Sequence, residues 1–309
     1  MKKAVLISNP LAGIKSAHRS RQIHEAVESL RSAGIAAVIN STLNPGDGER
    51  LARAAVNAGC DLVIVCGGDG TINEVVNGMA PTPIPLAILP GGTANIVAKD
   101  LGLPGRLVKA ARQLPYWLPH RISLGRASWE EWGSLRQRYF LSVAGIGFDA
   151  RIISHLDIPM KLRLGILAYG WEALRQASRY GFPRFQCAVN GSSVSATFAV
   201  IQRSSRYAGW LRLAGPRSLH DPDFSCCLFT SSSRMRYLLY ALSVLTQTHH
   251  RLPDVRFLRC SRVSCASGKE DQAVYFEVDG EMAGRIPVTF EIIPDALTLL
   301  APRAFCAAP

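Results

Sequence analysis

Residues 67–71 have the types and spacing that phosphate chemistry needs. The sequence Gly-Gly-Asp-Gly-Thr follows directly on the apolar run at 62–66. Glycines lack Cβ atoms, so a ligand can approach their backbone closely, and the free N–H groups at a helix start attract phosphate. The carboxylate of Asp69 adds an oxygen ligand of the kind that Mg²⁺ prefers. We therefore predict a phosphate-binding turn with Asp69 beside a cation.

We expect Thr71 to cap the helix that follows this turn. Thr71 and Glu74 have the spacing of a capping box, in which each side chain satisfies a backbone N–H group. In the alternative interpretation the glycines only make a tight turn, Asp69 is a turn residue, and the other two are caps. That alternative explains single residues but not the whole set after a buried strand, so we favour a functional turn.

Two further turns of this kind occur in the first hundred residues. Residues 8–13, Ser-Asn-Pro-Leu-Ala-Gly, follow an apolar run, and an ordinary Asn-Pro turn is an equally good interpretation of them. Residues 90–95, Pro-Gly-Gly-Thr-Ala-Asn, again place a double glycine and a hydroxyl before a helix. The sequence contains no GxxxxGK[ST] motif, and no GxGxxG motif follows the first strand. We therefore expect a different phosphate-binding architecture, in which the turns at 67–71 and 90–95 bind one nucleotide from two sides.

Alternating strands and helices are expected to position these turns. Apolar runs predict strands at 4–8, 35–40, 62–66 and 86–89, and helical spacing predicts helices at 16–33, 49–58, 72–79 and 94–101. Near-continuous apolar strands of this kind indicate a parallel sheet that is covered on both faces. Ligands bind at the carboxyl ends of such strands, where all three turns fall. Residues 1–122 are therefore predicted to form an α/β nucleotide-binding domain.

The pattern changes to strands after residue 122. Expected strands lie at 138–143, 185–189, 194–202, 255–263, 274–278 and 287–293, with helices at 160–180 and 235–246. Asn190-Gly191 is a strong hairpin signal. We predict a mostly antiparallel, β-sandwich-like second domain over 123–293, with the tail 294–309 returning to the first domain.

Composition narrows the possible classes of protein. The 309 residues are 48% hydrophobic, which allows two domains with real cores. The net charge of +12 favours anionic partners such as acidic phospholipid, nucleotide or nucleic acid. The eight cysteines show no metal-binding spacing, and in a chain this long we expect reduced residues of a cytosolic protein, mostly packed as small hydrophobic residues. No signal peptide is apparent and the apolar stretches are too short to span a bilayer, so we expect a cytoplasmic protein with peripheral contact at the inner membrane surface.

The motifs taken together resemble the diacylglycerol kinase catalytic-domain family, soluble lipid kinases that include bacterial diacylglycerol kinases and sphingosine kinases. The resemblance rests on Asn9-Pro10-x-x-Gly13, Gly67-Gly68-Asp69-Gly70-Thr71-x-Asn73-Glu74-Val75-x-Asn77-Gly78, Pro90-Gly91-Gly92-Thr93-x-Asn95 and Leu101-Gly102-x-Pro104. It continues through Gly145-x-Gly147-Phe148-Asp149-Ala150, Lys161-x-x-x-Gly165 with Ala168-Tyr169, and Val278-Asp279-Gly280-Glu281. It thus covers nearly the whole chain, in order.

The resemblance implies phosphorylation of the hydroxyl of a diacylglycerol-like lipid by ATP with Mg²⁺. It places ATP against Asn9, Pro10, Gly13, Thr42, Gly67, Gly68, Asp69, Gly70, Thr71, Asn73, Gly92, Thr93 and Asn95. It makes Glu281 the acceptor of the hydroxyl proton and gives Asp69 a part in metal binding or catalysis. For Thr42, a plain turn residue is an equally good interpretation, and Asp279 and Glu281 alone fit a solvated hairpin turn.

Three further features carry alternatives. Asp149 lies where relatives meet the lipid head group, or else it caps the next helix. Ser218, Asp221 and Asp223 fall on the ligand positions of a second, structural Mg²⁺ in relatives, but Pro222 stands where relatives have glycine, and a metal-free loop is the alternative. The basic helical stretch at 160–180 either rests on an acidic membrane or has one buried and one solvated face.

Two other functions compete with a lipid kinase. NAD kinases and sugar kinases share Gly-Gly-Asp-Gly but lack the Pro-Gly-Gly-Thr-x-Asn and Asp-Gly-Glu elements. A non-catalytic regulator that senses nucleotide or lipid would keep the fold, yet intact Asp69 and Glu281 argue against it. No nucleic-acid partner is expected. The choice among a diacylglycerol, a long-chain base and a prenol is open at this point.

Overall fold

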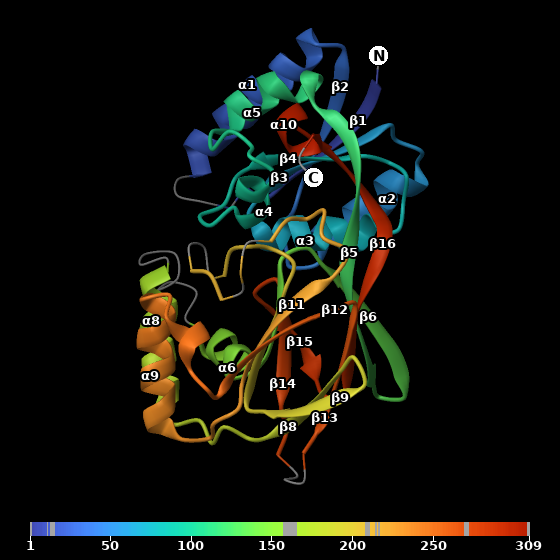
Figure 1. The fold of residues 1–309 in the computed structure, drawn as a ribbon. Helices are drawn as coiled ribbons and strands as arrows, with labels where there is room; N and C mark the ends of the chain where they lie inside the picture. The colour runs from blue at the N-terminus through green and yellow to red at the C-terminus, as the bar shows by residue number, and fades with distance from the viewer. Residues whose placement is uncertain are drawn as a thin grey trace. The chain divides into compact units, whose positions relative to one another are not determined.

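A computed structural model of the protein describes residues 2–10, 12, 16–156, 166–207, 211–213, 215, 217–268 and 272–307. The chain forms two compact units (Figure 1). The first consists of Met1–Leu124 and Pro294–Pro309, and the second consists of Gly125–Ile293. Among the described helices, none has the length and hydropathy needed to cross a membrane.

The first unit is an α/β unit with a parallel sheet. Its elements are β1 (Lys2–Ser8), α1 (Ser16–Ser32), β2 (Ile35–Ser41), α2 (Asp47–Asn57), β3 (Leu62–Gly67), α3 (Asp69–Met79), β4 (Leu86–Pro90), α4 (Ile96–Asp100), α5 (Leu107–Gln113), η1 (Leu114–Tyr116) and α10 (Arg303–Cys306). The strand order is β2-β1-β3-β4, and the end of β16 (Val288–Ala301) joins β4 in parallel. Strands β3 and β4 are buried along their whole length, as their apolar sequences predict.

The predicted capping box at the start of α3 is wrong. The helix begins at Asp69, its N-cap is Gly68 in an extended conformation, and no side chain caps it. Glu74 instead accepts hydrogen bonds from the backbone N–H groups of Gly46 and Gly48, each at 2.9 Å. The carboxylate thus serves the start of α2 rather than the start of its own helix, a tertiary contact that residue spacing does not reveal.

The second unit contains two antiparallel layers. Its strands are β5 (Leu118–Glu131, entering from the first unit), β6 (Ser134–Phe140), β7 (Val143–Gly147), β8 (Phe185–Val189), β9 (Ser192–Ala196), β10 (Phe198–Gln202), β11 (Phe224–Phe229), β12 (Val255–Cys260), β13 (Arg262–Ser267), β14 (Tyr275–Val278), β15 (Glu281–Arg285) and the first part of β16. One sheet has the order β12-β11-β10-β7-β14-β15, and the other contains β16-β13-β8-β9. The helices are α6 (Phe148–His155), α8 (Ile166–Ala177), α9 (Arg234–Leu245) and η2 (His249–Arg251).

Three expected strands of this unit are each two strands. The breaks fall at residues 141–142, at Thr197 and at Ser261. At every break the chain leaves one sheet and enters the other, from β6 to β7, from β9 to β10 and from β12 to β13. Such corners are made where the chain bends out of one sheet into the other, and both sheets face the same core. The expected strands ran across these residues without a break, so the corners were missed, and the strands β5, β11 and β15 and the helix α5 were also not predicted.

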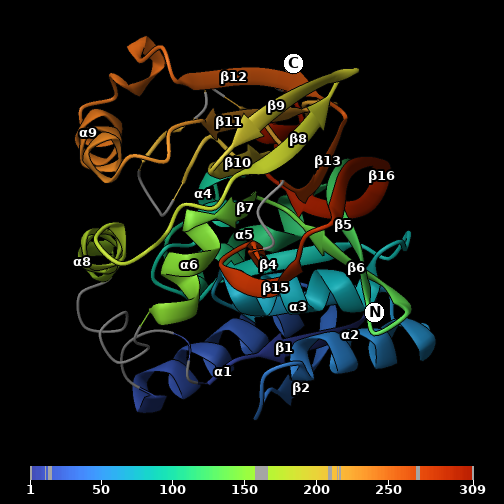
Figure 2. The same cartoon turned by 90° about the horizontal axis from the view of Figure 1, so that it is seen from below.

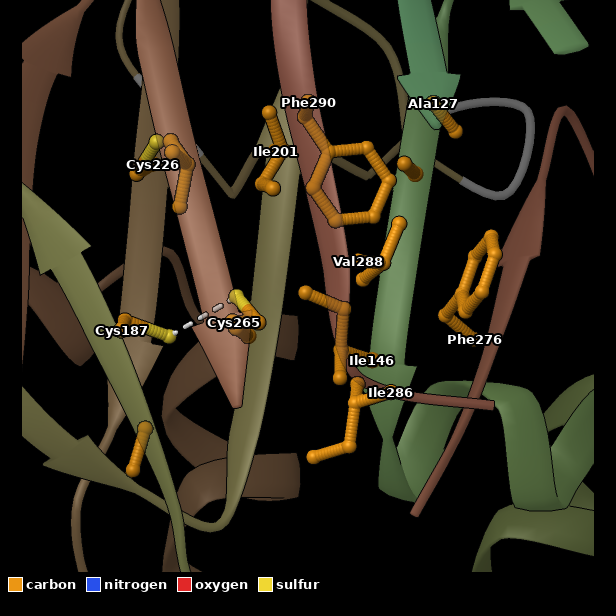
Figure 3. Close-up of a cluster of buried hydrophobic side chains, with 14 of the residues drawn as sticks. Ala127, Ile146, Cys187, Ile201, Cys226, Cys265, Phe276, Ile286, Val288 and Phe290 are labelled. Atoms are coloured by element: carbon orange, nitrogen blue, oxygen red, sulfur yellow. Dashed lines mark hydrogen bonds between the residues drawn. The ribbon is translucent and has the colours of Figure 1, made fainter. Parts of the chain in front are cut away.

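Apolar side chains from both sheets fill the space between them (Figure 3). Phe290 on β16 meets the rings of Phe140 and Phe276 edge to face, with centroids 6.2 and 5.7 Å apart. Cys187 and Cys265 lie opposite each other on β8 and β13, with their sulfur atoms 3.4 Å apart. All eight cysteines are free and seven are buried, which confirms that they pack as small hydrophobic residues.

Candidate active site

Strand pairing brings the three predicted turns to one edge of the first sheet. Ser8 on β1 pairs with Cys66 on β3, and Gly67 pairs with Pro90 on β4. The ladder continues into the turns, because Asn9 N donates to Cys66 O at 3.0 Å and Gly91 N donates to Gly67 O at 2.9 Å. The turns after β1, β3 and β4 are therefore neighbours.

The two double-glycine turns touch backbone to backbone. A Cβ atom at Gly92 would lie 2.5 Å from Gly68 Cα, and one at Gly91 would lie 3.0 Å from Gly67 N. Such distances leave no room for any other residue, so these glycines are required by the contact between the turns themselves. The sequence suggested ligand access as their purpose, and the structure adds this second reason.

Asp69 lies at the junction of these turns. Its Oδ1 accepts a hydrogen bond from Ile96 N, the first residue of α4, at 2.8 Å. Asn95 holds the second turn in shape, because its Oδ1 accepts from Gly92 N at 2.8 Å and its Nδ2 donates to Gly92 O at 2.9 Å. Asn95 has a left-handed backbone (φ 48°), so α4 begins at Ile96 rather than at residue 94 as expected. The carboxylate of Asp69 is thereby fixed between α3 and α4.

The remaining predicted ATP contacts differ in their surroundings. Asn9 Nδ2 donates to Thr71 Oγ1 at 3.2 Å, which ties the first turn to the second. Thr42 is buried and its backbone N–H donates to Ser8 O at 2.9 Å. Asn73 is fully buried and its Oδ1 accepts from Asn77 Nδ2 at 3.2 Å, so its side chain faces the interior of the unit. Gly13 lies outside the described residues.

A hollow of about 520 Å³ opens beside the Gly91-Gly92 turn. Its lining consists of Arg19, Gln22, Pro90, Gly91, Gly92, Thr93, Asn95, Gly105, Arg106 and Leu107. Arg19 Nη2 donates to Ala12 O at 2.7 Å and to Gly91 O, so it bridges the first and third turns. The two arginines provide positive charge next to a glycine turn, which suits a phosphorylated ligand. The sequence analysis did not identify Arg19 or Arg106; the available signal was a cation one turn into the helix after the first turn.

The Asp279-Gly280 turn of the second unit gives the carboxylates of Asp279 and Glu281 different partners. Asp279 and Gly280 have φ values of 49° and 85° and join β14 to β15 as a two-residue hairpin. The Asp279 carboxylate accepts the N–H groups of Leu141, Ser142 and Val143 at 2.8, 2.8 and 3.0 Å. Glu281 remains partly exposed and accepts a hydrogen bond from Arg138 on β6. Asp279 is therefore a structural anchor, whereas the Glu281 carboxylate is partly exposed beside Arg138.

Asp149 belongs to a buried carboxyl pair. It is the second residue of α6, whose N-cap is Gly147, so the helix-cap alternative is wrong. Tyr207 donates its hydroxyl to Asp149, and the Glu277 carboxyl hydrogen-bonds to the same side chain. Burial raises the pKa of both carboxyl groups, and the charge of Asp149 raises the pKa of Glu277 further. One carboxyl of the pair must hold a proton to make this bond.

Glu277 connects this pair to the hairpin that carries Glu281. Its Oε2 accepts the Gly280 N–H at 2.6 Å. The pair also explains the glycine at position 145, where a Cβ atom would lie 1.9 Å from Asp149 Oδ2. Glu277 was missed because it occupies an ordinary strand position, paired with Gly145 across β14 and β7.

Guanidinium groups occupy the loop in which a second Mg²⁺ was expected. Asp221 Oδ2 accepts Ser218 N at 2.8 Å and lies 3.3 Å from Arg217 Nε. Asp223 receives Arg217 Nη2 at 2.6 Å and two nitrogens of Arg259 at 2.9 Å, and the Arg259 bonds, helped by Arg217, lower the pKa of Asp223. Across the described part of the chain, no group of three His, Cys, Asp or Glu side chains is placed to hold a metal. Arranged in this way, these residues do not fit a bound Mg²⁺.

A second arginine is buried beside this loop. Arg203 is fully buried at the end of β10, and its Nη2 donates to Leu219 O at 3.0 Å. Within the described ranges its Nε and Nη1 have no hydrogen-bond partner, and burial lowers its pKa to about 10. The loop is therefore surrounded by cations that the chain itself supplies.

Comparison with known proteins agrees with this geometry. Residues 3–127 match the family model of the diacylglycerol kinase catalytic domain, and residues 142–301 match that of the YegS C-terminal NAD kinase beta sandwich-like domain. A probable lipid kinase YegS-like from Chromohalobacter salexigens is 31% identical over 91% of this chain and 89% of its own. A diacylglycerol kinase from Mycobacterium tuberculosis is 28% identical over 97% and 96%.

Solved structures share the fold. A putative diacylglycerol kinase from Bacillus anthracis superposes with a TM-score of 0.79 at 21% identity, covering 98% of this chain and 96% of that chain. Yeast NADH kinase complexed with NADH gives 0.53 at 11% identity, covering 98% and 84%. The predicted combination of a parallel α/β unit and an antiparallel sandwich is confirmed. From the family models and the relatives that span it almost end to end, we conclude that this chain belongs to the diacylglycerol kinase catalytic-domain family of kinases.

Proposed function

We propose that the protein transfers the γ-phosphoryl group of ATP to the hydroxyl of a diacylglycerol-like lipid. The observation that carries this proposal is the contact between the two double-glycine turns, with Asp69 fixed at their junction and Arg19 bridging to the first turn. Backbone N–H groups and guanidinium groups gathered at one sheet edge are what a polyphosphate needs.

The first unit binds and orients the donor. Asn9, Gly68, Thr71 and Gly92 present backbone and hydroxyl groups at the sheet edge, and Arg19 and Arg106 offset phosphate charge. Asp69 is the residue that would hold Mg²⁺, which neutralises charge on the transferring phosphoryl group when bound. Pro10, Gly67, Gly70, Thr93 and Asn95 shape the same turns. Thr42 and Asn73 are buried, so we give them a supporting role for these turns rather than a direct contact with ATP.

Glu281 accepts the proton of the lipid hydroxyl in this proposal. The Arg138 hydrogen bond orients the carboxylate that would act as the base. Asp149 is the proposed contact for the lipid head group. It is linked to the hairpin of Glu281 through Glu277, which hydrogen-bonds to both Asp149 and Gly280 N.

The names of the relatives favour a lipid over a nucleotide acceptor. The relatives that match almost end to end are called diacylglycerol kinase or probable lipid kinase, whereas the NADH kinase shares only the fold. We therefore rank phosphorylation of NAD second.

A transfer assay with several acceptors tests the proposal. The purified chain is mixed with γ-labelled ATP, Mg²⁺ and detergent micelles that contain a diacylglycerol, a long-chain base or a prenol, with NAD in a parallel reaction. We expect label in one lipid class, none in NAD, and loss of labelling in Asp69→Asn and Glu281→Gln. ATP binding without any labelled lipid would instead indicate a sensor, and labelled NAD would indicate an NAD kinase.

A further inference from the structure

Helix α9 exposes an apolar face. Its buried residues Tyr237, Tyr240 and Ser243 face the core of the second unit. The opposite side carries Met235, Leu238, Leu239, Leu242 and Leu245, whose exposed fractions run from 38% to 73%. These positions recur at intervals of three and four residues, so they form one stripe along the helix. An exposed stripe of large aliphatic side chains is unusual on a water-facing helix.

The neighbouring helix α8 also exposes large apolar side chains. The two helices lie side by side in both views of the molecule (Figures 1 and 2) and contact each other. Both pack on the same aromatic cluster, in which Phe182 stacks on Tyr237 with ring centroids 3.7 Å apart. Trp171 and Leu174 of α8 are more than half exposed. We call Trp171, Leu174, Met235, Leu238, Leu239, Leu242 and Leu245 the α8–α9 face.

The segments that form and flank the face are rich in arginine. The described segments 166–184 and 231–259 contain eight, of which Arg259 is paired with Asp223, namely Arg175, Arg179, Arg184, Arg234, Arg236, Arg251, Arg256 and Arg259. They contain two acidic residues, Glu172 and Asp254. Both acids are paired, Glu172 with Arg175 at 3.3 Å and Asp254 with Arg236. Helix α9 itself has no acidic residue, and exposed Arg234 and Arg251 lie at and beyond its two ends.

This combination selects among possible occupants. A second copy of the chain would bring arginines against arginines, and like charges across an interface oppose association. A nucleic acid would match the charge but would leave the leucines without an apolar partner. The surface of an anionic bilayer offers both, with acyl chains for the stripe and phosphates for the arginines. Helix α9 has 12 residues, which suits a helix lying in the plane of the interface rather than across it.

We propose that the α8–α9 face docks the protein on anionic phospholipid membranes, with α9 lying in the interface. This inference deepens the proposed function, because the substrate of a lipid kinase resides in a bilayer. It concerns binding alone, so it can be tested without nucleotide and without catalysis. The proposed membrane contact thus lies mainly on α9 rather than on the basic stretch at 160–180. Residues 160–165 of that stretch lie outside the described residues.

Flotation of the whole chain with vesicles tests the proposal. Vesicles of phosphatidylglycerol and phosphatidylcholine in equal parts are compared with vesicles of phosphatidylcholine alone, without ATP, at low and high salt. We expect binding to the anionic vesicles, weak binding to the neutral ones, and partial loss at high salt because salt screens the arginines. The double variant Leu242→Gln with Leu245→Gln should bind at least about tenfold more weakly, since two exposed leucines that would enter the bilayer are lost.

A matched double variant controls for the loss of surface hydrophobicity. Leu135→Gln with Trp132→Gln removes two exposed apolar side chains of the same unit, outside the face, and should bind like the unchanged chain. Unfolding midpoints check that both doubles are folded. Equal binding to neutral vesicles, unchanged binding by the Leu242/Leu245 double, or a dimer in sedimentation velocity that this double abolishes would each overturn the proposal.

Activity in detergent micelles separates this proposal from the proposed function. The Leu242/Leu245 double should phosphorylate micellar lipid at the rate of the unchanged chain and vesicle lipid more slowly. Absence of transfer by the unchanged chain in micelles would refute the kinase proposal and leave docking to be judged by flotation alone. Equal loss in micelles and vesicles would show that these leucines serve folding or catalysis rather than docking.

Discussion

The glycine turns of the first unit and the Asp279-Gly280 hairpin of the second both present a carboxylate, but different contacts hold them. The glycine turns meet backbone to backbone, so that Gly68 Cα lies 2.5 Å from where a Cβ atom at Gly92 would be. The hairpin is held by side chains, through Asp279 on three backbone N–H groups, Glu277 on Gly280, and Arg138 on Glu281. The glycine turns, the proposed donor side, are therefore sensitive to volume, whereas the hairpin, the proposed acceptor side, is sensitive to charge and protonation.

The largest expected effect separates the two carboxylates of the hairpin. Glu281→Gln should lower kcat by about 10²–10⁴-fold, because a general base typically contributes that much. The unfolding midpoint should hardly change, since this carboxylate is partly exposed. Asp279→Ala should instead cost about 1–3 kcal/mol of stability, because three N–H groups lose their acceptor. Steady-state kinetics and urea unfolding measure both. Full activity in Glu281→Gln would remove the residue from the mechanism.

Gly92→Ala tests the backbone contact on the donor side. Its methyl group would overlap Gly68 Cα, so we expect a loss of about 1–3 kcal/mol in the free energy of unfolding and weaker ATP binding. Gly105→Ala is the control for stability. Gly105 lines the same hollow, has no atom within 4 Å of where the added methyl group would lie, and does not have a positive φ. Equal unfolding midpoints for the two variants would contradict close contact between the turns.

The sequence predicted the glycine turns better than the hairpin, because local patterns form the turns whereas contacts between distant side chains hold the hairpin. Local periodicity and residue type predict parallel strands and glycine turns, so the turn at residues 67–71 could be predicted at the edge of the sheet. Contacts between distant side chains leave no such trace. The capping box at Thr71 failed because Glu74 binds the start of α2, and Glu277 gave no signal because it occupies a plain strand position. The sheet-switching corners at residues 141–142, 197 and 261 were missed because the expected strands were continued across them.

Arg217→Met tests whether the chain supplies its own cation in the 218–223 loop. Arg217 is nearly buried between Asp221 and Asp223, so its loss should cost about 1–3 kcal/mol, less than for a fully buried pair because both carboxylates are partly exposed. For the unchanged chain without ATP, EDTA should leave the thermal midpoint where it is. Arg259→Met is the control, and it should cost less because Arg259 is largely exposed. A lower midpoint in EDTA would mean that the loop does bind a metal.

Glu277→Gln should have the smallest effect near pH 4, where both side chains can donate to Asp149, and its growth with pH reports the protonation of the Asp149–Glu277 pair. Glutamine can donate to Asp149 and accept from Gly280 as protonated glutamic acid does, but it has no proton to lose. A carboxyl whose pKa is raised in the folded state binds its proton more tightly than in the unfolded chain. Its contribution to stability is therefore complete below the unfolded pKa of about 4.3 and is lost as pH rises toward the folded value.

The unchanged chain should thus lose stability relative to Glu277→Gln as pH increases from about 4.3, by up to about 1.4 kcal/mol per pH unit, until the folded pKa is passed. Urea unfolding at successive pH values gives this difference directly. Parallel curves for the two proteins would mean that the pair does not hold a proton, and the acceptor hairpin would then rest on charge alone. A difference in the free energy of unfolding that grows with pH would show that a protonated carboxyl stabilises the hairpin carrying Glu281. The glycine turns have no such dependence on protonation.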